Sequence, residues 1–164
     1  MRTTCLALLI ALVPCAGFGQ ALLVSPAAGY GSAVADKIKG ECKLSETQSE
    51  SVLKHLSAAG ISAQAAASDA VPAKGRFLQL RIESAMSAGN GFTGHRKQVT
   101  TSAHLFENGK ETAQTTLSRD STGGAFGGYK GSCNVLRRCA ITLGKDIAGW
   151  VKTQPAQSPA APAR

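Results

Sequence analysis

The stretch that decides the fold is residues 132–150, which read SCNVLRRCAITLGKDIAGW. Its apolar residues recur every three or four positions, as expected for one buried face of a long helix. These residues are Cys133, Leu136, Ala140, Leu143, Ile147 and Trp150. Burial of each large apolar side chain contributes about 1.5–3 kcal/mol, so we expect this helix to cover a sheet and to supply much of the core.

The strands of that sheet are expected upstream of the helix. Residues 76–87, 95–107 and 111–121 alternate between apolar and polar side chains, which predicts three half-buried strands. Asn108-Gly109 separates the last two, and this dipeptide is a strong signal for a tight hairpin. A weaker alternation over residues 61–68 predicts one more short strand.

The segment before these strands predicts a strand followed by a helix. Over residues 36–44, Ile38, Gly40, Cys42 and Leu44 alternate with charged residues, which is typical of a half-buried strand. Ser45-Glu46-Thr47-Gln48 matches a capping box, and Gly60 suits a left-handed helix end, so we expect a helix over 46–59. The predicted order is β-α-β-β-β-β-α, an α+β fold with a mainly antiparallel sheet and two helices packed on one face.

The ends of the chain indicate export. Residues 1–19 combine one positive charge with a short apolar run and then small residues, which predicts a signal peptide cleaved after Gly19 or Ala21. Pro14 precedes Cys15 and disfavours the alternative of a lipid-anchored cysteine. We expect a linker over 20–35, one domain over 36–152, and a disordered Pro/Ala-rich tail over 153–164. No apolar run is long enough for a transmembrane segment, so the expected location is periplasmic or secreted.

The charge balance is basic, with 18 Lys and Arg against 10 Asp and Glu. A net charge of +8 permits contact with an anionic surface and equally suits plain solubility. Arg138, Lys145 and Lys152 recur every seven residues and predict a basic stripe, which is either an anionic-surface contact or a solvated helix face. Export removes nucleic acid from the expected partners.

Three cysteines follow the predicted signal peptide: Cys42, Cys133 and Cys139. Cys133 and Cys139 lie on one predicted helix, which separates them by roughly 9 Å along its axis, whereas bridged alpha carbons lie within about 7 Å. Cys42 on the inward face of the first strand and Cys133 at the start of the inward helix stripe form the expected disulfide, with Cys42–Cys139 as the alternative. Cys139 is then a buried apolar residue or, alternatively, a reactive thiol.

Two glycine-rich loops carry the candidate binding residues, because glycines let backbone amides approach a ligand. The residues are Phe92, His95, Arg96 and Lys97 in one loop, and Phe126, Tyr129 and Lys130 in the other. Neither loop has a phosphate-binding pattern, and the glycines also suit tight turns. The histidines His55, His95 and His104 have no metal-ligand spacing, and no nucleophile elbow occurs. The sequence thus predicts no catalytic residue, no metal and no cofactor.

The segments NGFTGHRK (90–97), LFENGK (105–110), SxGGAFGGYKGSC (121–133) and LGKDIAGW (143–150) resemble a family of small exported bacterial proteins of unknown function. This resemblance implies that the cysteines at positions 42 and 133 are shared within the family. The order of elements is similar to small envelope accessory domains, such as the amino-terminal part of the Tol-system periplasmic protein.

Three hypotheses about function follow. The first is a non-enzymatic periplasmic or secreted module that binds an envelope component or a protein partner through the two glycine-rich loops. The alternative is a small secreted hydrolase acting on cell-wall or lipid material, in which His95 or His104 lies within hydrogen-bond reach of Ser, Cys or Asp in a cleft. The third is a toxin-like or inhibitory protein that acts outside the cell, which composition does not separate from the first.

Overall fold

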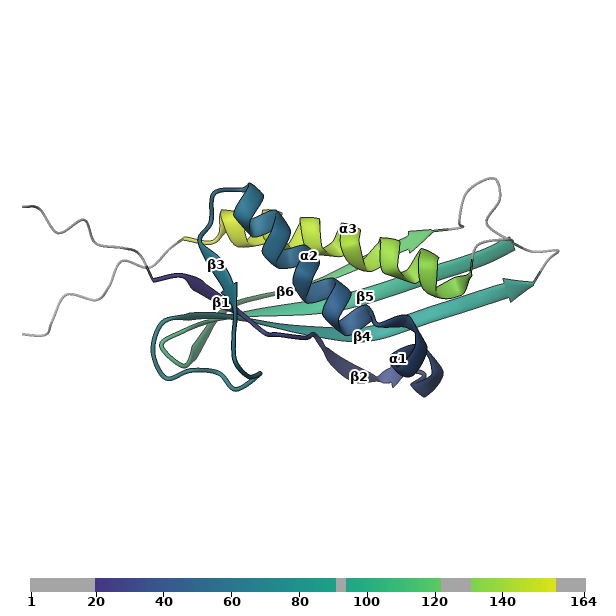
Figure 1. The fold of residues 1–164 in the computed structure, drawn as a ribbon, viewed down its shortest axis with the longest axis horizontal. Coiled ribbons are helices and arrows are strands. Elements are labelled where there is room, and N and C mark those ends of the chain that lie inside the picture. Colours follow the sequence, from purple (N-terminus) through teal and green to yellow (C-terminus); the bar gives the residue numbers. More distant parts are fainter. Residues whose placement is uncertain (1–19, 91–93, 122–130, 156–164) are drawn as a thin grey trace, which may run out of the picture.

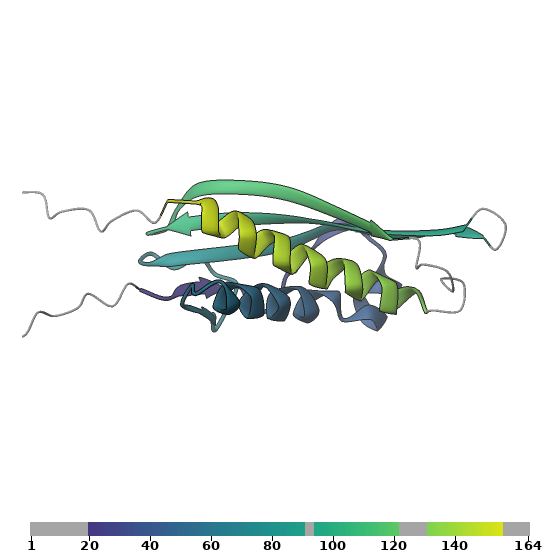
Figure 2. The same cartoon turned by 90° about the horizontal axis from the view of Figure 1, so that it is seen from above.

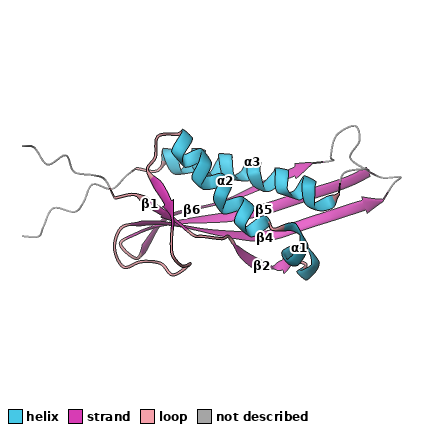
Figure 3. Cartoon of the chain, in the orientation of Figure 1, coloured by secondary structure: helices cyan, strands magenta, loops and turns pink. Residues whose placement is uncertain are grey.

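The computed structural model describes residues 20–90, 94–121 and 131–155 of the chain. These ranges form two layers, a sheet and the helices that cover one of its faces (Figure 1, Figure 2). The strands are β1 (Leu22–Val24), β2 (Gly29–Val34), β3 (Ala63–Ala65), β4 (Arg76–Asn90), β5 (Gly94–Glu107) and β6 (Lys110–Ser121). The helices are α1 (Asp36–Cys42), α2 (Leu44–Ala58) and α3 (Ser132–Thr153), drawn in cyan in Figure 3.

The sheet combines a long antiparallel part with a short parallel edge. β4, β5 and β6 pair antiparallel, whereas β1 and β2 both run parallel to β4, and β3 runs parallel to β1. The order across the sheet is β3-β1-β4-β5-β6, with β2 also beside β4. The fold is therefore α+β with a mostly antiparallel sheet, as predicted.

The core lies between the sheet and the two long helices. Of the six residues in the predicted α3 stripe, Leu136, Ala140, Leu143 and Ile147 are buried, and Cys133 and Trp150 are partly buried against them. They meet alternate residues of the sheet, among them Leu78, Leu80, Ile82, Val99, Ala103 and Leu105. The 3–4 spacing of α3 and the two-residue period of the strands place their apolar faces against each other.

The hairpin between β5 and β6 confirms the Asn108-Gly109 prediction. Both residues have positive φ, 52° and 79°, as the two central residues of a type I′ turn require. Glycine and asparagine reach this region at low cost, and its twist matches that of the two strands. The turn fixes the register of Glu107 opposite Lys110 and Phe106 opposite Glu111, after which a one-residue bulge shifts the pairing to Leu105 opposite Ala113 and, at the far end, Lys97 opposite Ser121.

The prediction of a strand over 36–44 is wrong, because this segment forms helix α1 and the start of α2. Ile38 and Cys42 also stand four residues apart, and this spacing places both on one side of a helix. α1 ends at Cys42, and Lys43, with a left-handed φ of 49°, separates it from α2 and brings Leu44 into the core. The chain therefore has three helices within the described residues rather than two.

The predicted capping box at Ser45 is also absent, because Ser45 already lies inside α2. Its hydroxyl donates to the Ala28 carbonyl at 2.5 Å, and its amide donates to the Tyr30 hydroxyl at 3.1 Å. This serine therefore ties α2 to the segment that enters and forms β2. The helix otherwise spans the predicted residues, and Gly60, with φ 76°, follows its end.

Residues 20–35, which we expected to be a linker, contain β1 and β2. Leu22 and Val24 of β1 are buried, and the hydroxyl of Ser25 accepts a hydrogen bond from the Leu80 amide at 3.1 Å. The observed order is therefore β-β-α-α-β-β-β-β-α, which agrees with the prediction only from α2 onward. Within the described ranges, no helix is both long enough and apolar enough to cross a bilayer.

Candidate functional site

A disulfide joins the end of α1 to the beginning of α3. The Sγ atoms of Cys42 and Cys133 are 1.97 Å apart and their alpha carbons 4.8 Å apart. Cys42 is the last residue of α1, and the chain turns away directly after it at Lys43. The structure thus joins the pair that the sequence analysis favoured over Cys42–Cys139, although Cys42 comes from a helix and not from a strand.

Beside this bridge lies a groove of about 580 Å³ between α1, β4, α3 and the end of β2, which we call the disulfide groove. The bridged cysteines form part of its wall. Its other apolar lining residues are Ala33, Ala35, Ile38, Ala85, Met86 and Leu136. Since α1 and α3 are covalently connected, two walls of the groove are held at a fixed separation.

Met86 is the most exposed large apolar residue of this groove. β2 ends at Val34 opposite Ala85, so β4 continues past its partner and Met86 lies just beyond the end of β2. Half of the Met86 surface remains exposed, 50%, and among the described residues only Ile141, at 47%, is a comparably exposed large apolar side chain. Ile141 does not line the disulfide groove, so the two residues form a matched pair for experiments.

The rim of the disulfide groove is polar. Lys37 and Glu41 stand four residues apart on α1, and the Ser87 hydroxyl donates to the Ser132 hydroxyl at 3.1 Å between β4 and α3. An apolar interior with a few polar groups at its mouth is the usual arrangement of a small ligand site. The groove can therefore hold an apolar group whose polar end stays at the rim.

The glycine-rich loops predicted to bind lie largely outside the described residues. Phe92, Phe126, Tyr129 and Lys130 belong to segments 91–93 and 122–130. The flanking residues show that both segments leave the same end of the sheet, where Lys97 of β5 pairs with Ser121 of β6.

Three of the predicted loop residues are part of strand β5. His95 is opposite Gly89 of β4. Arg96 is exposed and forms an ion pair with Asp120 of β6 at 3.4 Å. Lys97 is only 2% exposed, on the side of β5 that faces the helices. Arg96 is thus available at the surface, whereas Lys97 is not.

The hydrolase hypothesis requires a histidine beside Ser, Cys or Asp in a cleft. His104 lies on β5 with its Nδ1 3.0 Å from an oxygen of Glu111, on the side of the sheet that faces away from the helices. It does not line the disulfide groove. This histidine therefore lacks the surroundings that the hypothesis demands.

Cys139 is a free cysteine, buried on α3. Burial, with a smaller contribution from the Asp120 carboxylate, raises the pKa of its thiol above the usual value. A raised pKa keeps the sulfur protonated and slow to react. This environment fits the interpretation of Cys139 as a small apolar residue.

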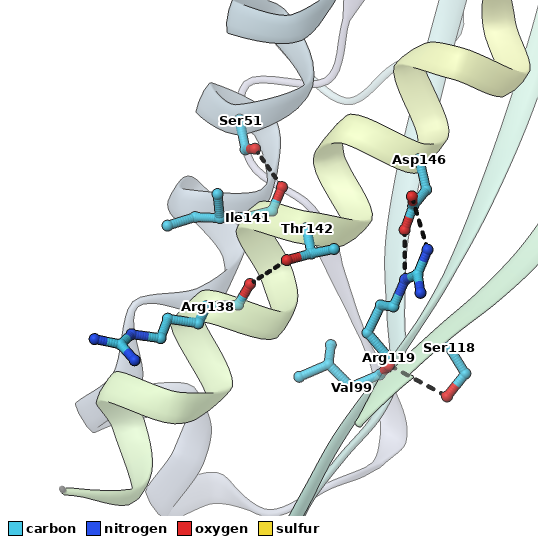
Figure 4. Close-up of polar contacts among 8 residues, drawn as sticks. All are labelled: Ser51, Val99, Ser118, Arg119, Arg138, Ile141, Thr142 and Asp146. Atoms are coloured by element: carbon cyan, nitrogen blue, oxygen red, sulfur yellow. Dashed lines mark hydrogen bonds and ion pairs between the residues drawn. The ribbon is translucent and has the colours of Figure 1, made fainter. Parts of the chain in front are cut away.

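The basic stripe of Arg138, Lys145 and Lys152 is exposed along α3. The neighbouring Asp146 instead binds Arg119 of β6 through two hydrogen bonds of 2.7 and 2.9 Å (Figure 4). This pairing raises the pKa of the Arg119 guanidinium and fixes α3 beside β6.

The residues of the disulfide groove were not among the predicted binding residues. Ile38 lies on α1, which the sequence analysis predicted as a strand, and α3 is far from it in sequence. Met86 lies beyond the end of β2, which the sequence analysis did not recognise as a strand. The one available signal was Cys42 itself, because a disulfide predicts that the segments around both cysteines lie together.

No protein-family model matches the sequence, and no curated protein is similar to it. Solved structures do share the fold. The protein XCC0632 from Xanthomonas campestris, described as DUF330, is 16% identical over 80% of this chain and 82% of its own, with a TM-score of 0.53. A variant of PelC from Paraburkholderia phytofirmans, a dodecamer, is 12% identical over 79% and 89%, with a TM-score of 0.51. The hypothetical protein CT253 from Chlamydia trachomatis is 9% identical over 82% and 99%, with a TM-score of 0.50. At such low identity the similarity establishes the fold alone.

Proposed function

We propose that this chain is an exported, non-enzymatic binding module of the bacterial envelope, which holds an apolar group of an envelope component or partner protein in the disulfide groove. The observation that carries the proposal is an apolar groove whose walls, α1 and α3, are joined by a covalent bridge. A preformed site loses little conformational entropy on binding, which favours affinity.

Export is supported by the disulfide, because such bonds persist in oxidising compartments and are rare in the cytosol. The apolar run in residues 1–19 and the resemblance of segments within residues 90–150 to a family of exported proteins agree with it. The basic stripe of α3 and the two glycine-rich loops are additional surfaces for an anionic envelope component in this proposal.

The binding site can be tested by site-specific photocrosslinking in cells. A photoreactive amino acid replaces Met86 in one variant and Ile141 in the matched control, since both side chains are about half exposed. We expect a discrete adduct from position 86 and none from position 141. The additional substitution Ile38→Asp, in the same groove, should abolish the adduct from position 86. Equal labelling from both positions, or none from position 86, would contradict binding in the disulfide groove.

Export is tested separately through the redox state of the cysteines. Thiol alkylation of the full chain in cells should leave Cys42 and Cys133 unmodified until a reductant is added. A variant that lacks residues 1–19 should remain in the cytoplasm and react at all three remaining cysteines after denaturation without reductant. Reaction of Cys42 and Cys133 of the full chain before any reductant is added would contradict export through this segment.

A further inference from the structure

Strand β6 forms one edge of the sheet and is open to pairing along its middle. Among the described residues it pairs only with β5. Its charged residues lie at its two ends, whereas residues 113–118, AQTTLS, contain no charge, no proline and no bulge. Edge strands that stay unpaired are usually protected by charges, prolines or bulges. Because residues 113–118 have none of these, another strand can pair with the centre of β6.

A groove runs between this edge and helix α3. It encloses about 420 Å³, and its lining includes Leu117 of β6 and Gly149 and Trp150 of α3; we call it the edge groove. Arg119 binds Asp146, and Leu117 and Trp150 line the same groove, so β6 and α3 run in opposite directions along its two sides (Figure 1). Extended peptides add to a sheet by pairing with an exposed edge strand, and the helix beside β6 provides a surface for the side chains of such a peptide.

We propose that β6 accepts an extended, acidic segment of a partner protein as an additional strand. Backbone hydrogen bonds to the centre of β6 supply affinity, and alternate side chains of the added strand point into the edge groove. An apolar side chain there contacts Leu117 and Trp150, and a carboxylate reaches Lys145 at the rim.

The charges that line the edge groove indicate the charge expected of the partner segment. Arg119 and Asp146 neutralise each other, whereas Lys145 has no ion pair among the residues that the structure describes. Lys152 and Arg138 continue the positive charge along α3. A second copy of this chain would bring the same lysine and another net charge of +8 to the edge, so an acidic peptide fits better than self-pairing.

The test uses three fluorescent eight-residue probes. The first alternates threonine with valine and glutamate, so that all side chains on one face are apolar or acidic. The second replaces each glutamate with lysine. The third keeps the first sequence but carries N-methyl groups on alternate amides of the edge that would pair with β6, which removes backbone donors without changing charge. Binding is measured by fluorescence anisotropy with the full chain.

Gly149→Leu adds an apolar side chain at the lining of the edge groove, and the Cβ at this position meets nothing within 4 Å. Gly40→Leu is the matched control, since Gly40 is also an exposed helical glycine with open space around it. Leucine favours helix more than glycine does, so neither variant should unfold the chain. Lys145→Glu reverses the charge at the rim.

We expect the acidic probe to bind the native chain and the Gly40→Leu variant equally, and Gly149→Leu to weaken it roughly tenfold or more. Lys145→Glu should reverse the preference between the acidic and the basic probe, and the N-methylated probe should not bind. The proposal is overturned if the acidic probe fails to bind below roughly 1 mM, or if N-methylation or Gly149→Leu leaves its affinity unchanged. It is also overturned if light scattering shows an oligomer that Gly149→Leu converts to a monomer, because the occupant would then be a second copy.

Discussion

The close approach of α2 to α3 at Gly144 yields a quantitative prediction. A Cβ at this position would lie 2.6 Å from the Cβ of Ser51 and 3.0 Å from its carbonyl carbon. The Ser51 hydroxyl also donates to the Ile141 carbonyl at 2.8 Å across the same contact (Figure 4). Gly144→Ala must therefore push the two helices apart or disturb this hydrogen bond.

The cost follows from three contributions. Overpacking costs about 1–3 kcal/mol, and a weakened hydrogen bond about 0.5–1.5 kcal/mol, whereas alanine gains about 1 kcal/mol over glycine in helix propensity. We expect Gly144→Ala to lower the free energy of unfolding by about 1–3 kcal/mol. Gly149→Ala in the same helix has open space around its Cβ, so it should raise that free energy by about 0.5–1 kcal/mol.

Urea unfolding followed by circular dichroism measures both variants, with linear extrapolation to water. Ser51→Gly provides a double-mutant cycle, because it removes the side-chain part of the clash with Ala at 144, leaves the backbone contact, and should give a coupling energy of roughly 1–2 kcal/mol. The reasoning is refuted if Gly144→Ala is as stable as the native chain. A rise in the free energy of unfolding in both glycine variants would refute it equally, because helix propensity alone would then explain the data.

Three further predictions concern the covalent bridge and two perturbed side chains. Replacement of Cys42 and Cys133 by serine should lower the free energy of unfolding by about 4–5 kcal/mol in the chain-entropy model, measured by urea unfolding; a loss below roughly 1 kcal/mol would contradict it. The Cys139 thiol has a raised pKa, so native protein should react with a thiol reagent more slowly than urea-unfolded protein; equal rates at pH 8 would contradict its burial. Tyr30→Phe leaves the Ser45 amide without its acceptor and should cost about 1 kcal/mol. Burial raises the Tyr30 pKa, so the contribution of Tyr30 to stability is full below the pKa of an unfolded tyrosine and is lost as pH rises through the folded value. The difference in free energy of unfolding between the native chain and Tyr30→Phe should therefore shrink near pH 11.

Sequence patterns located the elements whose periods are long and consistent. The α3 stripe spans the full helix, and β4, β5 and β6 are each at least 12 residues long, so their alternation is unambiguous. The Asn108-Gly109 turn adds a local signal that does not depend on tertiary structure. These elements together determine the antiparallel part of the sheet and the helical layer over it.

The elements that were missed are short or depend on distant partners. α1 has seven residues, in which a helical and an alternating pattern share the same apolar positions Ile38 and Cys42. β1 has three residues, too few for any period, and it is a strand because β4 lies beside it, more than fifty residues away in sequence. Parallel pairing of this kind has no turn signature, since its two strands are joined by a long connection.

The same distinction explains why the two grooves escaped sequence analysis. Chemical motifs identify a site when the residue types themselves carry the chemistry, as metal ligands and nucleophiles do. The disulfide groove and the edge groove instead combine apolar side chains with a few charged residues at the rim, and their significance comes from where strands end. Met86 is exposed because β2 stops at Val34, and the edge groove exists because β6 has no further neighbour among the described residues. Both sites are therefore consequences of sheet topology, and substitutions that fill them while preserving the fold, such as Gly149→Leu, test function more directly than substitutions of the charged residues that the sequence makes conspicuous.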